Sequence, residues 1–154
     1  MKRVLGLDVG DRRIGVAISD ELGITARGLC ALERSNLKAD TQRILDIVRE
    51  NDCSCIVIGL PLNLSGADSL QTEKVREFAV KLENKLVSNA MQEVRVELFD
   101  ERFTTVIADR AMKDSGASQE KRREVIDMQA AAVILGDWLS GGGQGPEEAG
   151  GIGS

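Results

Sequence analysis

The chain has 154 residues, of which 42% are hydrophobic and 29% charged, a composition typical of one soluble globular domain. It contains no histidine, which excludes a Ser-His-Asp triad, a Cys-His pair and a His-ligated zinc. Any metal must therefore be held by oxygen ligands, which favours Mg²⁺ or Mn²⁺. The net charge of −5 argues against a dedicated non-specific nucleic-acid binder, but a nuclease stays possible because acidic metal ligands contribute to that total.

Long apolar segments are missing from the sequence. No apolar run approaches ~20 residues, and a strand pattern begins by Val4, which leaves no room for a signal peptide. We therefore expect a cytoplasmic protein without a membrane partner. The odd number of cysteines favours reduced core thiols over a disulfide framework; they are Cys30, Cys53 and Cys55.

The first third of the chain reads as three short strands. Apolar runs at 4–9 and 14–18 flank a polar break, Gly10–Arg13, which predicts a β-hairpin. A third strand is expected over 24–32, with a bulge at Gly28. Three strands joined by tight turns form an antiparallel meander.

One carboxylate, Asp8, interrupts the first strand near its end. A charged group on a central strand is costly to bury unless a cation, hydrogen bonds or water compensate it. The residues alone leave two interpretations open: a buried acid with such a partner, or a last strand residue that points to solvent.

The periodicity then alternates between helix and strand. A helix is predicted from a cap at Ser35 or Asn36 to an end at Asn51–Asp52, followed by a strand over 55–59 that is buried on both faces. The loop that follows, Gly59–Gly66, leaves the carboxyl end of this strand, a common place for ligands in α/β sheets. A second helix starts at Asp68 or Ser69, and a fifth strand covers 94–99.

The C-terminal part begins with Asp100–Arg102 at the end of that strand. One helix is predicted from Thr104 or Thr105 to about Met112, and another over 118–139. The apolar stripe predicted for the last helix is Val125, Met128, Ala132, Leu135 and Leu139, with Asp127 beside it on the face shared by Ala131, Ile134 and Trp138. We assign residues 1–139 to one domain and residues 140–154 to a Gly-rich disordered tail.

This order of elements predicts an α/β fold with a five-stranded mixed sheet and helices on both faces. The meander supplies strands one to three, and strands four and five join through helical crossovers. In this layout Asp8, Glu101 and Asp127 could converge at one edge. Convergent carboxylates repel one another unless a divalent cation lies between them, and such sites support attack of water on a phosphodiester.

Four motifs in the same order resemble the YqgF/RuvX family: Leu5–Gly10 with Arg13–Ala17, Gly59–Asn63, Asp100–Thr105, and Asp127 with Ala130–Leu135. The resemblance covers about residues 4–138. It implies a ribonuclease H-like fold, with Asp8, Glu101 and Asp127 as catalytic acids and ligands of Mg²⁺ or Mn²⁺. It also implies a nuclease that trims the 5′ end of precursor 16S rRNA. Phe103 stands where the motif commonly has Leu, and the segment before Asp127 lacks a common Gly-Lys.

Several basic and polar side chains are candidates for binding the phosphate backbone. Arg12, Arg13 and Arg102 adjoin the proposed acids, and Asn63 lies in the loop after the fourth strand. Lys121, with Arg122 and Arg123 beside it, can supply further charge near Asp127. For Arg102 an equal alternative is a salt bridge that orients Glu101 or Asp100.

Other functions fit parts of the same pattern. A Holliday junction resolvase, acting on four-way DNA as a dimer, is the near alternative, so RNA or branched DNA is the expected partner and the chain is a monomer or a homodimer. An Asp-x-Gly hairpin also occurs in sugar-kinase and actin-like ATPases, although those proteins need a second such domain. A non-catalytic nucleic-acid-binding module is the third option.

Overall fold

The computed structural model describes residues 2–103 and 119–142. Its strands are β1 (Arg3–Val9), β2 (Arg13–Ser19), β3 (Ala26–Glu33), β4 (Cys53–Leu60) and β5 (Arg95–Asp100). Its helices are α1 (Leu37–Asn51), α2 (Leu70–Ser88) and α4 (Gln119–Asp137), with a 3-10 turn at Glu101–Phe103 and a short π-helical segment at Trp138–Gly142.

The five strands form one mixed sheet in the order β3-β2-β1-β4-β5. The β1, β2 and β3 strands are antiparallel neighbours, whereas β4 runs parallel to β1, and β5 runs parallel to β4. This confirms the predicted meander, the two crossover strands and the central place of β1. The register shifts between Val16 and Ala17, opposite Gly28, where a bulge was expected.

The third strand starts later than predicted. Ile24 is 68% exposed and lies before β3, because the chain is still turning there. The Asp20 carboxylate accepts hydrogen bonds from the backbone N–H groups of Ile24 and Thr25, which fixes this turn and lowers the pKa of Asp20. A short apolar residue pattern could not separate this turn from the strand that follows.

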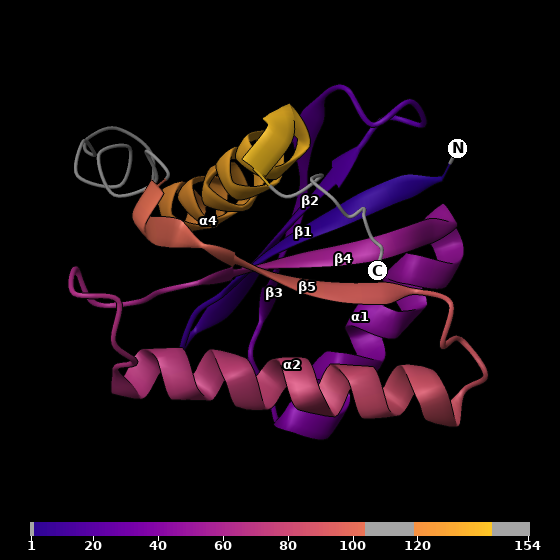
Figure 1. The fold of residues 1–154 in the computed structure, drawn as a ribbon, viewed down its shortest axis with the longest axis horizontal. Coiled ribbons are helices and arrows are strands. Elements are labelled where there is room, and N and C mark those ends of the chain that lie inside the picture. Colours follow the sequence, from indigo (N-terminus) through magenta and orange to yellow (C-terminus); the bar gives the residue numbers. More distant parts are fainter. Residues whose placement is uncertain (1, 104–118, 143–154) are drawn as a thin grey trace.

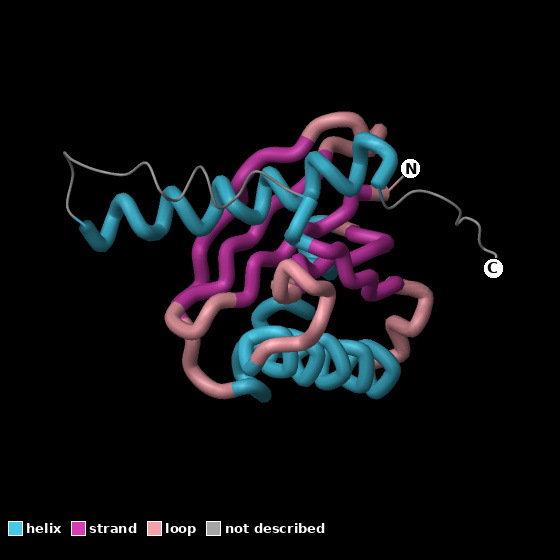
Figure 2. The backbone as a smooth tube through the Cα atoms, turned by 60° about the vertical axis from the view of Figure 1, so that its left-hand side comes forward, coloured by secondary structure: helices cyan, strands magenta, loops and turns pink. Residues whose placement is uncertain are grey.

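Helices cover both faces of the sheet: α1 and α2 lie on one side, and α4 crosses the other (Figure 1; Figure 2). The two helices beneath the sheet begin at the predicted residues, since Asn36 caps α1 and Ser69 caps α2. Among the described residues, no helix combines the length and the apolar character that a membrane span requires.

Side-chain size alternates along the central strands with the period of two expected of a pleated sheet. The face toward α1 and α2 carries bulky buried residues, among them Leu5, Leu7, Ile14, Val16, Ile18, Ile56 and Ile58. The opposite face carries small ones, among them Gly6, Gly15, Ala17 and Gly59. Because the side chains on this face are short, α4 can approach the strand backbones closely.

The buried stripe of α4 agrees with the predicted one only in part. Leu135 is buried as predicted, and Ala132 and Leu139 pack against the same cluster. Ala131, Ile134 and Trp138 are buried as well, whereas Val125 is 42% exposed. At 3.6 residues per turn, Val125 lies about 120° around the helix from Ala131. The small alanines that contact the sheet gave a weak hydrophobic signal, so the larger side chains at the margin shifted the predicted stripe.

Two sequence predictions fall outside the described residues. The helix expected from Thr104 or Thr105 to Met112 is one of them, and the predicted Gly-rich tail beyond residue 142 is the other.

Candidate active site

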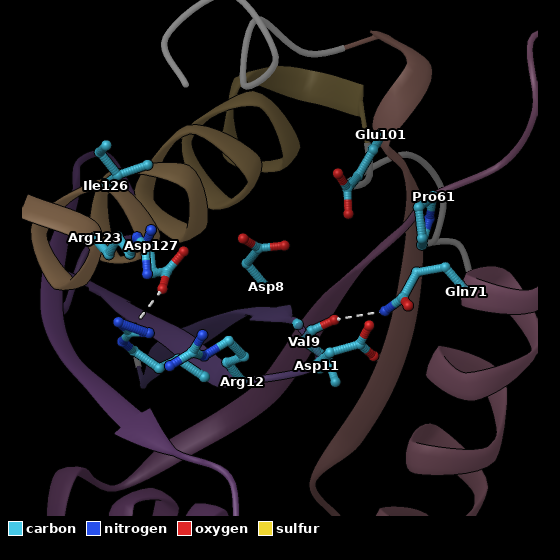
Figure 3. A pocket seen from close by; sticks show the side chains of 12 residues that line it. Asp8, Val9, Asp11, Arg12, Pro61, Gln71, Glu101, Arg123, Ile126 and Asp127 are labelled. Carbon is cyan, nitrogen blue, oxygen red and sulfur yellow. Dashed lines mark hydrogen bonds and ion pairs between the residues drawn. The ribbon is translucent and has the colours of Figure 1, made fainter. Parts of the chain in front are cut away.

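A cavity of about 610 Å³ opens where β1, the β1–β2 turn, the 3-10 turn after β5 and α4 meet. Figure 3 shows Asp8 on its floor, with the carboxylates of Asp127 and Glu101 on either side. The remaining lining residues come from the end of β1 and the turn into β2, from the loop after β4, from the start of α2 and from α4; they are Val9, Gly10, Asp11, Arg12, Arg13, Pro61, Gln71, Arg123 and Ile126.

The strand pairing sets the position of Asp8. It lies within β1 opposite Gly15 of β2, and it is 7% exposed. The alternation of side chains along β1 places Asp8 on the same face as Val4 and Gly6, the face that α4 covers. The interpretation of Asp8 as a strand end that points to solvent is therefore wrong, because β1 continues to Val9 and the side chain is buried beside the cavity.

A glycine brings Asp127 to this point. A Cβ atom on Gly15 would lie 2.0 Å from the backbone oxygen of Asp127 and 2.6 Å from its carbonyl carbon. Only a residue without a side chain lets the α4 backbone rest there. Since Gly15 pairs with Asp8, the same contact sets Asp127 next to Asp8 across the cavity floor.

Glu101 reaches the cavity from the other side. It is the first residue of the 3-10 turn after β5, and its side chain extends toward the cavity (Figure 3). Three carboxylates from separate parts of the chain, predicted to converge, therefore line one cavity.

The two arginines of the β1–β2 turn have different environments. Arg12 is exposed and lines the cavity. Arg13 is buried: its guanidinium lies 3.9 Å from an Asp127 carboxylate oxygen and donates a hydrogen bond of 3.3 Å to Glu120. Arg13 thus holds the side chain of Asp127 from beneath, in addition to lining the cavity.

Arg34 and Asp40 secure the same turn from behind. Arg34 donates to the backbone oxygen of Gly10 at 2.7 Å and to the Asp40 carboxylate at 2.7 Å, and its guanidinium lies 5.6 Å from the centre of the Phe78 ring. Asp40 is fully buried and also accepts from the backbone N–H of Ser35. This network ties the rim of the cavity to α1.

Three predicted substrate contacts lie elsewhere. Arg102 forms a bidentate pair with Asp100, which lowers the pKa of that carboxyl, and also donates to the backbone oxygen of Leu64. The salt-bridge alternative for Arg102 therefore describes its conformation here. Asn63 and Lys121 are exposed and do not belong to the cavity lining.

Arg123 and Gln71 are among the lining residues that the sequence did not assign to the site, although Arg123 belongs to the basic run at 121–123 that was expected to supply charge. Arg123 lies four residues before Asp127, so one turn of helix puts both on the same side of α4, a spacing that could have identified it. Gln71 donates to the backbone oxygen of Val9 at 3.3 Å, which links the start of α2 to the end of β1. No local pattern signals the role of Gln71, because it depends on a contact across 62 residues.

The donor set of the cavity fits a divalent cation. Carboxylate oxygens of Asp8, Glu101 and Asp127 are hard ligands, which Mg²⁺ and Mn²⁺ prefer. A further acidic set, in which oxygens of Glu33, Glu120 and Glu124 lie within 4.8 Å of one another, does not line the cavity.

Comparison with known proteins shows the family to which the chain belongs. Residues 2–141 match the family model RuvX, described as "Holliday junction resolvase". The chain belongs to the RuvX family. It is 46% identical to a Koribacter versatilis protein named "Putative pre-16S rRNA nuclease", over 95% of this chain and 92% of that one. A Clostridium tetani protein of the same name is 47% identical, with coverage of 89% and 95%.

Solved structures of low sequence identity share the fold of this RuvX family member. T. thermophilus RuvC, in complex with a Holliday junction substrate, superposes with a TM-score of 0.54 at 13% identity, over 90% of this chain and 94% of that one. The yeast mitochondrial Holliday junction resolvase Ydc2 gives a TM-score of 0.56 at 10% identity, over 90% and 78%. The predicted ribonuclease H-like fold is confirmed.

Proposed function

We propose that this protein is a metal-dependent nuclease that hydrolyses phosphodiester bonds, and that its substrate is the 5′ end of precursor 16S rRNA. The observation that carries the proposal is the meeting of Asp8, Glu101 and Asp127 at one cavity from β1, the end of β5 and α4. Residues 1–139 form the proposed nuclease unit. The names of the relatives supply the class of RNA.

Asp8, Glu101 and Asp127 are the residues that would hold Mg²⁺ or Mn²⁺. A divalent cation bound there supplies a water of lowered pKa and stabilises the charge that develops on phosphate oxygens. Arg13, paired with Asp127, keeps that carboxylate in place and offsets its repulsion from Asp8. The site needs no histidine, which agrees with the composition of the chain.

Substrate phosphates would bind to the cationic rim. Arg12 lines the cavity from the β1–β2 turn and Arg123 lines it from α4, so both can contact phosphates next to the scissile bond. Lys121, exposed on α4, and Asn63, exposed in the loop after β4, would contact nucleotides that leave the cavity. Arg102 would contribute to substrate binding indirectly, because its hydrogen bond to the Leu64 carbonyl fixes the loop after β4.

Cleavage of a four-way DNA junction is the second candidate, and the shared fold with RuvC favours it. The two substrates should be compared side by side, with precursor 16S rRNA carrying its 5′ extension and a synthetic junction, each with Mn²⁺ or Mg²⁺. Glu101→Gln, purified in parallel, controls for contaminating nucleases. We expect the rRNA to be trimmed and the junction to be spared. Faster cleavage of the junction would overturn the rRNA assignment, and no wild-type cleavage of either would overturn the nuclease assignment.

A further inference from the structure

Gly59 occupies a position on β4 that faces α4. Cys55 and Val57, at two-residue intervals before it, are buried against that helix, and the same alternation puts Gly59 on the same face. In the parallel register of β4 and β5, Gly59 pairs with Phe99, two residues before Glu101. Glu101, which follows β5, therefore lies next to the side of Gly59 that has no side chain.

Two side chains occupy the space where a side chain of residue 59 would lie. A Cβ atom on Gly59 would be 2.7 Å from a carboxylate oxygen of Glu101, 3.0 Å from its carboxyl carbon and 2.6 Å from Cδ1 of Ile134. The Glu101 carboxylate thus rests against the bare backbone of β4, and the end of the buried Ile134 side chain lies against the same glycine.

We propose that Gly59 is a positioning residue for Glu101: its missing side chain lets the carboxylate lie back against β4 while it faces the cavity. This inference rests on the proposed function, in which Glu101 is one of the metal-binding acids. In this role Gly59 touches neither the metal nor the substrate, but it determines where one metal-binding carboxylate lies.

The contacts of Gly59 differ in kind from those of Gly15. A methyl group on Gly15 would meet the backbone of α4, so the helix would have to move. A methyl group on Gly59 would meet two ends of flexible side chains and no backbone atom among its nearest contacts. Because ordinary C···O contacts are about 3.3–3.6 Å, the Glu101 oxygen must retreat by roughly 0.6 Å or more. Gly59→Ala should therefore shift the carboxylate and preserve the fold.

The test uses two readouts, Mn²⁺ affinity by isothermal titration calorimetry and single-turnover cleavage of precursor 16S rRNA. Gly59→Ala should weaken each by about 10- to 100-fold, the range typical of residues that orient metal ligands. On the Glu101→Gln background, Gly59→Ala should change either readout by less than about two-fold, because the group it acts through is already altered. The matched control is Gly136→Ala on α4, where an added Cβ meets nothing within 4 Å; it should behave as wild type.

Ile134→Val separates the two contacts of Gly59, because it removes the Cδ1 atom and leaves Glu101 in place. If Gly59 acts on Glu101, the double variant Gly59→Ala/Ile134→Val stays impaired. Recovery of both readouts in that double variant, or an additive loss on the Glu101→Gln background, would overturn the inference.

The outcomes also separate this inference from the proposed function. Wild-type Mn²⁺ affinity and cleavage in Glu101→Gln would overturn the role of Glu101 and, with it, that of Gly59. An impaired Glu101→Gln beside a fully active Gly59→Ala would overturn the role of Gly59 alone.

Discussion

The contact between Gly15 and α4 allows a sharp prediction about the alignment of the active site. In Gly15→Ala, the new methyl group would lie 2.0 Å from the backbone oxygen of Asp127 and 2.6 Å from its carbonyl carbon. An ordinary C···O contact is about 3.3–3.6 Å, so the helix backbone must move by more than about 1 Å to relieve the overlap. Asp127 moves with it.

The expected cost has two parts. Overpacking of this kind lowers the free energy of unfolding by about 1–3 kcal/mol. A misplacement of about 1 Å in a catalytic group costs on the order of 100-fold in rate, so cleavage should fall more steeply than stability. The variant should therefore stay folded at 25 °C and still be nearly inactive.

The assay combines urea denaturation with single-turnover cleavage of precursor 16S rRNA in Mn²⁺. Gly136→Ala is the matched control, since it adds the same methyl group on α4, where nothing lies within 4 Å of it. Helix propensity favours alanine over glycine by about 1 kcal/mol, so the control should be at least as stable as wild type and equally active. Wild-type cleavage by Gly15→Ala would refute the claim that this contact aligns Asp127.

Three other predictions concern stability, substrate binding and thiol chemistry. Asp40→Ala removes a fully buried carboxylate that accepts from Arg34, and it should lower the free energy of unfolding by about 2–3 kcal/mol in urea denaturation; an unchanged midpoint would contradict this. Arg123→Ala should raise KM and reduce the dependence of log KM on log salt by about one phosphate contact; an unchanged salt slope would remove Arg123 from the substrate path. Burial raises the pKa of Cys53 to about 11 and that of Cys55 to about 12, so fewer than about one thiol in a thousand is ionised at pH 7.5. Iodoacetamide should label both in urea but not in the native protein, as peptide mass spectrometry would show.

The sheet could be predicted from the sequence because its signals are local. Polar turns, a change from strand to helix periodicity and a continuous apolar run at 55–59 were enough for the strand order. The identity of the face that meets α4 was also available in the residues. Gly6, Asp8, Gly15, Ala17 and similar small residues alternate with bulky ones, and this size alternation, unlike simple hydropathy, marks the face where a helix approaches closely.

Properties that depend on contacts distant in the sequence were harder to predict. Arg12 and Arg13 are adjacent residues of the same type, so the sequence does not distinguish them. In the structure β2 begins at Arg13, and the side chain of Arg13 lies under α4, where it pairs with Glu120 and Asp127. The pairing of Arg102 with Asp100 was weighed only as one of two alternatives, since a guanidinium beside an acid suits both a salt bridge and a phosphate. The contact of Gly59 with Glu101 requires the register of β4 and β5, which the sequence does not state.

The central claim is that the carboxylates of this cavity form one metal-dependent nuclease centre. Its most direct test is the single-turnover cleavage rate of Asp8→Asn on precursor 16S rRNA in saturating Mn²⁺, with folding checked by circular dichroism. Asp8 lies between the other two acids (Figure 3), and the substitution keeps its size while removing its charge. We expect the rate to fall by at least about 100-fold while the fold persists. A folded Asp8→Asn protein that cleaves at the wild-type rate would contradict the account.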